Sequence, residues 1–137
     1  LVLEQHCPGC GSDAHGRPAI TGEDDLHVSL SHARGWVAAV AADRPCGIDV
    51  EPVAPVAPLR GVLTPAEAAE LEGIAPDGRA AAFLRLWTRK EAVVKTGAAG
   101  LEDLGGLDVR GTEPTPGVRV LDLSTPPDVA AALALGG

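Results

Sequence analysis

The spacing of hydrophobic residues divides the first part of the chain into a polar segment and a series of strands. Residues 4–25 are rich in Gly, Pro, Asp and His and have no apolar repeat, so we expect a loop there. Apolar positions then alternate and run together over residues 26–40, which predicts two strands joined in a hairpin near Arg34-Gly35. The apolar run at residues 46–50 predicts one further strand.

The middle of the chain carries the signals of two helices. Thr64-Pro65-Ala66-Glu67 places threonine at a helix N-cap, proline at the first helical position and glutamate three residues after the cap. We expect that helix to continue to about Gly73. Residues 79–96 contain neither proline nor glycine and carry apolar positions at helical spacing, with Gly97 as the expected C-cap. This segment is predicted to be the longest helix.

The mixture of predicted strands and helices indicates an α+β fold. Three short apolar segments in the tail predict strands, at residues 107–109, 118–123 and 129–135. Alanine makes the last of them compatible with a helix as well. Prolines at 52, 55 and 58 form an extended connector, so we expect a boundary between one half at residues 1–55 and another at residues 56–137.

Charge and hydropathy narrow the classes of function. The chain of 137 residues has a formal net charge of −8, which argues against a nucleic-acid partner because phosphate binding needs a basic stripe. No run approaches the ~18 apolar residues of a membrane span, and no charged-then-apolar leader is present, so we expect a cytoplasmic protein without a membrane partner. Three cysteines, an odd number, do not suggest a disulfide framework.

Two carboxylates stand at the end of the strand predicted at residues 46–50. Asp49 and Glu51 are separated by one residue, so on a strand they project from one face while Ile48 and Val50 project from the other. Adjacent carboxylates repel each other, and a hard divalent cation would relieve that repulsion. The spacing alone is equally compatible with a solvated strand end.

The longest predicted helix carries both lysines of a sequence that has nine arginines. Because an ammonium is a compact point charge that a guanidinium does not replace, Lys90 and Lys95 are informative. Glu91 and Lys95 would form an ordinary helical ion pair, worth ~0.2–0.5 kcal/mol. However, Glu91 shares a helical face with Trp87, where a partly buried carboxylate needs compensation that a metal ion would supply.

Taken together, these motifs resemble the signature of a known family. Gly47-Ile48-Asp49-Val50-Glu51 is followed about forty residues later by Trp87-x-x-Lys90-Glu91-Ala92-x-x-Lys95, an order that resembles 4′-phosphopantetheinyl transferases. His15-Gly16-Arg17-Pro18 and Ser29-Leu30-Ser31-His32 resemble the coenzyme A-binding segments of the Sfp-type branch. The resemblance covers most of residues 6–101, although the first of these segments more often has lysine in place of Arg17.

The resemblance implies a pseudo-twofold pair of α+β halves, each a small antiparallel sheet packed with helix, with the active site between them. It implies transfer of the 4′-phosphopantetheine arm of coenzyme A to a serine of an acyl or peptidyl carrier protein. Mg²⁺ would be the cofactor, coenzyme A the co-substrate and 3′,5′-ADP the product, and we expect a monomer. The residues expected to meet an acidic carrier protein are Arg79, Arg85 and Arg89.

Residue roles follow from the same resemblance. The residues implied to hold Mg²⁺ are Asp49, Glu51 and Glu91. The residues implied to contact coenzyme A are Arg17, Ser31, His32, Lys90 and Lys95. The residues implied in catalysis are Glu91, Lys95 and Lys90. Glu67 matches a family glutamate that contacts a metal-bound water, but its place in a capping box explains it without any metal.

Three alternatives stay open at this point. Sfp-type enzymes usually have a longer N-terminal half with more basic residues, so a non-catalytic module that binds coenzyme A or a carrier protein also fits. A holo-acyl-carrier-protein synthase is similarly short but trimeric. Finally, Cys7 and Cys10, with His6 and His15 nearby, would suit a zinc site or a redox pair, although a closed zinc site needs four ligands.

Overall fold

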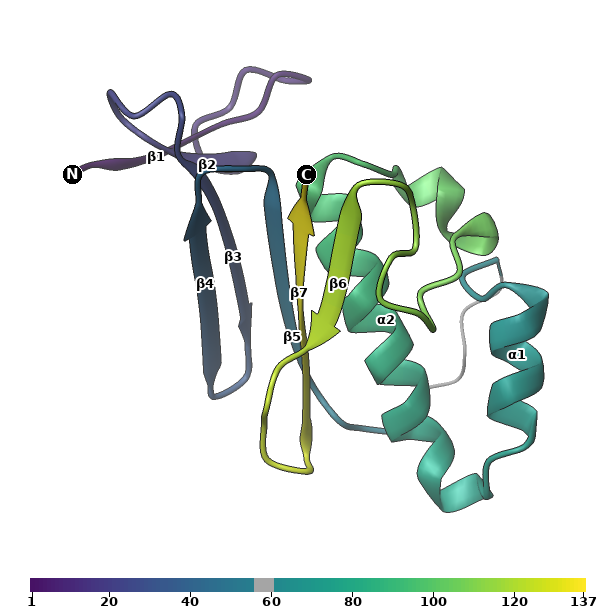
Figure 1. Cartoon of the computed structure of the whole chain (residues 1–137). Coiled ribbons are helices and arrows are strands. Elements are labelled where there is room, and N and C mark those ends of the chain that lie inside the picture. The colour runs from purple at the N-terminus through teal and green to yellow at the C-terminus, as the bar shows by residue number, and fades with distance from the viewer. Residues whose placement is uncertain (56–60) are drawn as a thin grey trace.

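Two antiparallel sheets and a group of helices make up the chain, which is described here from a computed structural model covering residues 1–55 and 61–137 (Figure 1). The first sheet has the order β1 (Leu3–His6), β2 (Arg17–Ile20), β3 (His27–Ala33), β4 (Trp36–Ala42). The second has the order β5 (Cys46–Pro52), β7 (Val129–Gly136), β6 (Val118–Asp122). The helices are α1 (Pro65–Glu72), η1 (Pro76–Gly78), α2 (Arg79–Thr96) and η2 (Leu101–Gly106). This arrangement confirms the predicted α+β class, and the long helix α2 packs on the second sheet.

The local signals for turns and helix ends are confirmed. Gly35 turns the hairpin between β3 and β4 at a φ of 82°, which favours glycine. The Thr64 hydroxyl accepts a hydrogen bond from the Glu67 N–H, and the Glu67 carboxylate accepts one from the Thr64 N–H, forming a capping box. Gly97 ends α2 in the left-handed conformation, with a φ of 87°.

Two expectations about secondary structure need correction, and the ambiguity at residues 129–135 is resolved in favour of the predicted strand. Residues 4–25 are not all loop, because β1 and β2 pair within them; most of their side chains are exposed or half-buried, so no apolar repeat marks the strands. Residues 107–109 form no strand, and the Val109 N–H is instead taken by the Glu67 carboxylate. Residues 129–135 are a strand, not a helix. The connector residues 56–60, which include Pro58, lie outside the described part of the chain.

Strand β5 belongs to the second sheet, although residues 1–55 were expected to form one half. Its register pairs Gly47 with Ala134 and Asp49 with Ala132 of β7. Its other edge lies along β3, where hydroxyl groups replace a backbone ladder. Ser29 Oγ accepts the Ile48 N–H at 3.1 Å, and Ser31 Oγ accepts the Val50 N–H at 3.2 Å. The two sheets therefore meet at a seam of serine side chains, defined here as Ser29 and Ser31 against β5.

Small residues of β5 and β7 line part of one face of the second sheet, and α2 lies close against it. Cross-strand partners share a face, so Gly47 and Asp49 lie on the same side as Ala132 and Ala134 of β7. Both alanines belong to the core that α2 completes. A Cβ atom added at Gly47 would collide with the Ala92 carbonyl oxygen of α2. The close approach of helix and strand at this point therefore requires glycine.

Within the described residues, no helix combines the length and the apolar composition needed to cross a membrane.

The packing of α2 on β5 predicts the effect of Gly47→Ala. The added methyl group must push the helix backbone away from the strand, and overpacking of this kind costs about 1–3 kcal/mol of unfolding free energy. Urea denaturation of both proteins measures the difference. Gly106→Ala is the matched control, because a Cβ atom there meets no other atom within 4 Å. Equal destabilisation by the two substitutions would contradict the role assigned to Gly47.

Candidate functional site

A buried aspartate on β5 forms the centre of the candidate site. Asp49 is only 4% exposed, since its strand is covered by α2 on one face and flanked by β3. Its Oδ1 atom accepts hydrogen bonds from Lys95 Nζ at 2.9 Å and from Ser31 Oγ at 3.0 Å. Its Oδ2 atom is buried and has no hydrogen-bond partner. A buried carboxylate oxygen without a partner is costly, so this atom needs a ligand that the described residues do not supply.

The charge of Asp49 shifts the pKa of two nearby glutamates. Burial and then the Asp49 carboxylate raise the pKa of Glu51, while Lys95 and a hydrogen bond from the Trp87 side chain lower it. Burial and then the Asp49 carboxylate also raise the pKa of Glu91; Lys95 opposes this shift and Glu51 adds to it. The three carboxylates that the sequence proposed as metal ligands are thus near enough to influence one another's pKa.

Lys95 is hydrogen-bonded in the site through both its side chain and its backbone. Its ammonium group donates to the Ile48 carbonyl oxygen at 2.9 Å as well as to Asp49 Oδ1, so it pairs across to β5. Its own carbonyl oxygen accepts a hydrogen bond of 2.7 Å from the Arg17 guanidinium of β2. Arg17 therefore reaches the C-terminal end of α2, where a cation is favourable. Both residues line a hollow of ≈ 280 Å³.

The donor set suits a hard divalent cation. Carboxylate oxygens are what Mg²⁺ prefers, and a cation beside Oδ2 of Asp49 would satisfy that atom and stabilise the ionised forms of Glu51 and Glu91. However, the three carboxylates do not converge on a common point in this structure. In the described parts of the chain, only Cys7, Cys10 and His15 bring three ligand atoms within 4.8 Å of one another. Closure around a cation would need rotation of the glutamate side chains.

Lys90 does not reach this site, contrary to the expectation that it contacts phosphate. Its side chain is fully buried, and its ammonium group lies 2.9 Å from Glu67 Oε2 and also donates to the carbonyl oxygens of Leu104 and Leu107. Glu67 is fully buried too and accepts from the Val109 N–H at 2.9 Å. This buried ion pair ties α1, α2 and the segment after η2 together, and both Glu67 oxygens are occupied by protein donors.

Ser31 and His32, both expected to contact coenzyme A, are separated by the alternation of β3. Ser31 is 8% exposed, and its hydroxyl is used by Asp49 and Val50. His32 is exposed and, as the next residue on the strand, projects from the opposite face. Ser31 therefore orients Asp49 in this structure, and only His32 is open to a ligand.

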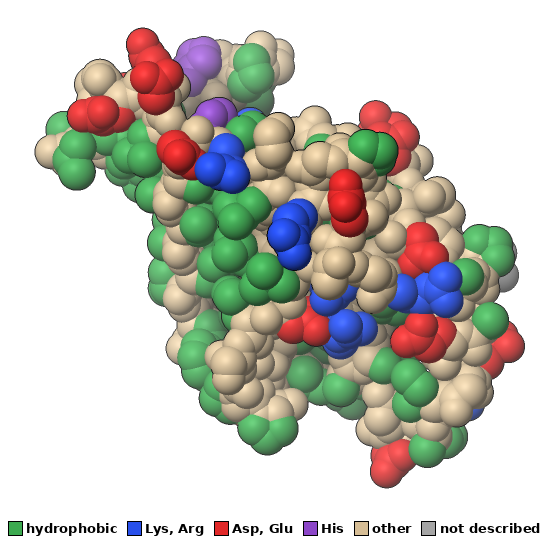
Figure 2. Space-filling model, in the orientation of Figure 1, with side chains coloured by type: hydrophobic (Ala, Val, Ile, Leu, Met, Phe, Trp, Pro, Cys, Tyr) green, Lys and Arg blue, Asp and Glu red, His purple; other side chains and the backbone are tan. Residues whose placement is uncertain are grey.

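The arginines of α2 are largely occupied, so they do not form the free basic face expected from the sequence. Arg79 donates to the carbonyl oxygens of Glu72 and Ile74 at the end of α1. Arg85 and Arg89 both donate to Asp122 of β6, at 2.6 and 2.7 Å. On the face shown in Figure 2, blue basic side chains accordingly lie beside red acidic ones without merging into one patch.

Two features of the site were missed by sequence reasoning. The collision at Gly47 depends on a helix about forty-five residues further along the chain, and only the contact itself reveals it. The seam has a local signal, because serines two residues apart on a strand face one neighbour. That spacing could have indicated Ser29 and Ser31 as hydrogen-bond acceptors for an adjacent strand.

Comparison with known proteins gives a consistent result. A family model described as the 4′-phosphopantetheinyl transferase superfamily matches residues 45–131. The chain is 30% identical over 93 residues to a 4′-phosphopantetheinyl transferase of Bacillus subtilis, covering 66% of this chain and 42% of the relative. It is 38% identical over 85 residues to 4′-phosphopantetheinyl transferase AcpT of Escherichia coli strain K12, covering 58% and 44%. For 4′-phosphopantetheinyl transferase Sfp of Bacillus subtilis strain 168 the identity is 29% over 89 residues, covering 64% and 40%. The chain thus spans less than half the length of these curated relatives.

Loss of Lys90 should destabilise the fold, because it leaves the buried Glu67 carboxylate without its cation. We expect Lys90→Met to lower the unfolding free energy by about 3–5 kcal/mol in urea denaturation. The double variant Lys90→Met with Glu67→Gln should recover only part of that loss, because no charge is then left unpaired but the glutamine NH2 replaces one of the two oxygens that accept from the Thr64 and Val109 N–H groups. A Lys90→Met protein of unchanged stability would refute the structural role of Lys90.

The raised pKa of Glu91 predicts a change of stability with pH in the presence of a metal chelator. A carboxyl whose pKa is raised by folding contributes stability below its ordinary pKa of 4.5 and loses it as the pH rises through the folded value. Glu91→Gln removes this penalty, so the variant should gain stability relative to wild type above about pH 4.5 and match it at lower pH. Urea midpoints over a pH series measure the difference. A difference in midpoint between Glu91→Gln and wild type that stays the same at every pH would contradict the raised pKa of Glu91.

Proposed function

Because the chain belongs to the 4′-phosphopantetheinyl transferase superfamily, we propose that it transfers the 4′-phosphopantetheine arm of coenzyme A to a serine of an acyl or peptidyl carrier protein. The observation that carries this proposal is the carboxylate group around Asp49, with its unpartnered buried oxygen. A purely structural module would gain nothing from such a site, because the unpartnered carboxylate oxygen raises the free energy of the metal-free fold.

We propose that Asp49, Glu51 and Glu91 hold Mg²⁺. When bound there, the cation would neutralise negative charge on the pyrophosphate oxygens of coenzyme A. Two observations support this proposal. The Asp49 carboxylate raises the pKa of both glutamates, and all the ligand atoms are oxygens. Ser31 and Lys95 would fix the Asp49 carboxylate so that Oδ2, and not Oδ1, is presented to the ligand.

Arg17 and Lys95 are the proposed phosphate contacts. Both line the hollow beside β2 and β3, and the Lys95 ammonium is already within reach of Asp49, so it can stand between carboxylate and phosphate. Lys95 would thereby supply positive charge, or a proton, to the 3′,5′-ADP leaving group. His32 is the proposed contact for the 3′-phosphate from the exposed face of β3. Lys90 is assigned to the structure of the fold because its ammonium is enclosed by Glu67 and backbone carbonyls.

Glu91 is the proposed base for the carrier serine. Beside a bound Mg²⁺ its carboxylate would be ionised, which is the form that can accept the serine proton. Glu91 lies one helical turn before Lys95 on the same face of α2, so the serine would approach beside Lys95. We propose a monomer, which would sediment near 13.9 kDa, whereas a synthase of the trimeric type would be three times heavier.

Transfer and metal binding can be tested on the same preparation. Incubation with coenzyme A, Mg²⁺ and a set of apo carrier proteins should yield the phosphopantetheine adduct in intact-mass spectra. Mg²⁺ should also raise the melting temperature of the chain, and Asp49→Asn should lose both effects while staying folded. Asp43→Asn, which removes an exposed carboxylate paired with Arg44, is the control.

Different outcomes separate the competing functions. Mg²⁺ stabilisation without transfer to any carrier protein would favour a non-catalytic module that binds coenzyme A. Equal stabilisation of wild type and Asp49→Asn by Mg²⁺ would remove Asp49 from the metal site, and with it the proposed mechanism.

A further inference from the structure

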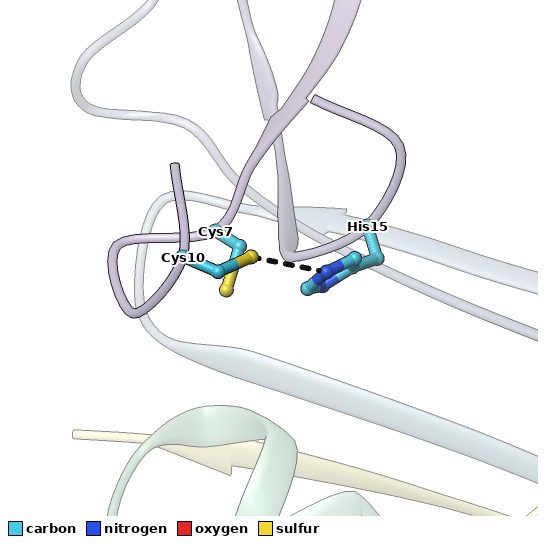
Figure 3. A group of neighbouring side chains, drawn as sticks. All are labelled: Cys7, Cys10 and His15. Carbon is cyan, nitrogen blue, oxygen red and sulfur yellow. Dashed lines mark hydrogen bonds between the residues drawn. The ribbon is translucent and has the colours of Figure 1, made fainter. Parts of the chain in front are cut away.

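The loop between β1 and β2 gathers the side chains of two cysteines and a histidine. Cys7, Cys10 and His15 place their ligand atoms within 4.8 Å of one another, and the Cys10 sulfur lies 3.3 Å from Nε2 of His15. Figure 3 shows both cysteine side chains and the imidazole ring turned toward a common point. This group lies in the first sheet, apart from the carboxylates of β5 and α2, and the proposed transfer chemistry makes no use of it.

The backbone of Cys7-Pro8-Gly9-Cys10-Gly11 is folded into a tight turn around the first sulfur. The Gly9 backbone passes close to the Cys7 sulfur, since a Cβ atom at Gly9 would lie 3.7 Å from it. The Gly11 N–H donates to the Cys7 carbonyl oxygen at 2.7 Å, and Gly11 has a φ of 73°, which favours glycine. The turn thereby places the Cys10 sulfur near the Cys7 sulfur.

Gly16, near the end of the loop, allows the chain to place His15 beside the two cysteines. Gly16 has a φ of 120°, and a Cβ atom there would collide with the carbonyl group of His6. The chain can therefore pass close to the end of β1, where His6 pairs with Arg17. As a result His15 arrives beside Cys10 although four residues separate them in sequence.

The separation of these ligand atoms matches a small tetrahedral ion. With Zn–S bonds of about 2.3 Å and Zn–N bonds of about 2.1 Å, the S···N edge of a tetrahedron is about 3.6 Å. The observed 3.3 Å between the Cys10 sulfur and His15 Nε2 is close to that edge. Thiolate and imidazole ligands together favour Zn²⁺ over the hard cations that carboxylates select.

We propose that Cys7, Cys10 and His15 bind one Zn²⁺ ion, with the fourth coordination position open to water or another external ligand. The ion would cross-link the loop at residues 7–15 and fix the start of β2. Arg17 begins that strand and donates to the carbonyl oxygen of Lys95. By fixing the start of β2, the zinc ion would indirectly fix the position of Arg17 in the hollow. A redox pair is the competing use of Cys-x-x-Cys, but it has no need of His15.

Cobalt provides the direct test, because Co²⁺ replaces Zn²⁺ and its thiolate complexes absorb in the near ultraviolet and visible. The reduced, metal-free chain should bind one equivalent of Co²⁺ with thiolate charge-transfer bands, and Zn²⁺ should abolish them. Cys7→Ser, Cys10→Ser and His15→Gln should each weaken cobalt binding at least about tenfold. Circular dichroism checks that each variant is folded, which is expected because the loop is mostly exposed.

Matched controls use the remaining residues of the same types. Cys46→Ala and His27→Gln should leave cobalt binding unchanged, since Cys46 is a buried core residue whose sulfur donates to the His27 carbonyl oxygen. Absence of the bands in a protein whose three thiols titrate as free would overturn the proposal. So would bands that survive Cys10→Ser, or rapid formation of a Cys7–Cys10 disulfide in a chain that binds no Co²⁺.

Discussion

The close contact between α2 and β5 is the constraint on which the candidate site depends. At Gly47 the helix backbone takes the space that a side chain would fill, and the alanines of β7 keep the rest of that face flat. Two residues further along β5, Asp49 thereby comes within hydrogen-bond distance of Lys95. Larger residues on this face would separate the carboxylates of the strand from those of the helix. The scarcity of aromatic side chains in the sequence is consistent with such tight packing.

Much of the fold could be predicted from local signals, because capping and turn chemistry are decided within a few residues. The capping box at Thr64, the C-cap at Gly97 and the hairpin at Gly35 all have this character. Strands β1 and β2 could not be predicted in the same way. They are short and mostly polar, so they carry no period, and their pairing depends on the turn that the cysteine loop makes.

The sequence predicted the positions of some site residues better than those of others, and helix geometry explains the difference. Glu91 and Lys95 are four residues apart and share a face, whereas Lys90 and Lys95 are five apart and point about 140° from each other. One lysine therefore faces β5 and the other faces the interior next to Glu67. Treating the two lysines as a pair overlooked this rotation. Arg85 and Arg89 of α2 were misjudged for a different reason, since their partner Asp122 lies on β6, more than thirty residues away.

The serine seam between the two sheets has a mechanical consequence. A backbone ladder fixes register, because sliding one strand past the other breaks every bond at once. Hydroxyl groups rotate about a single bond, so β3 can shift along β5 while Ser29 and Ser31 follow the amide groups of Ile48 and Val50. Ser31 also donates to Asp49, which means that any such slip is felt at the carboxylate. A shift of β3 would therefore change the hydrogen bond that Ser31 gives to the acidic centre on β5.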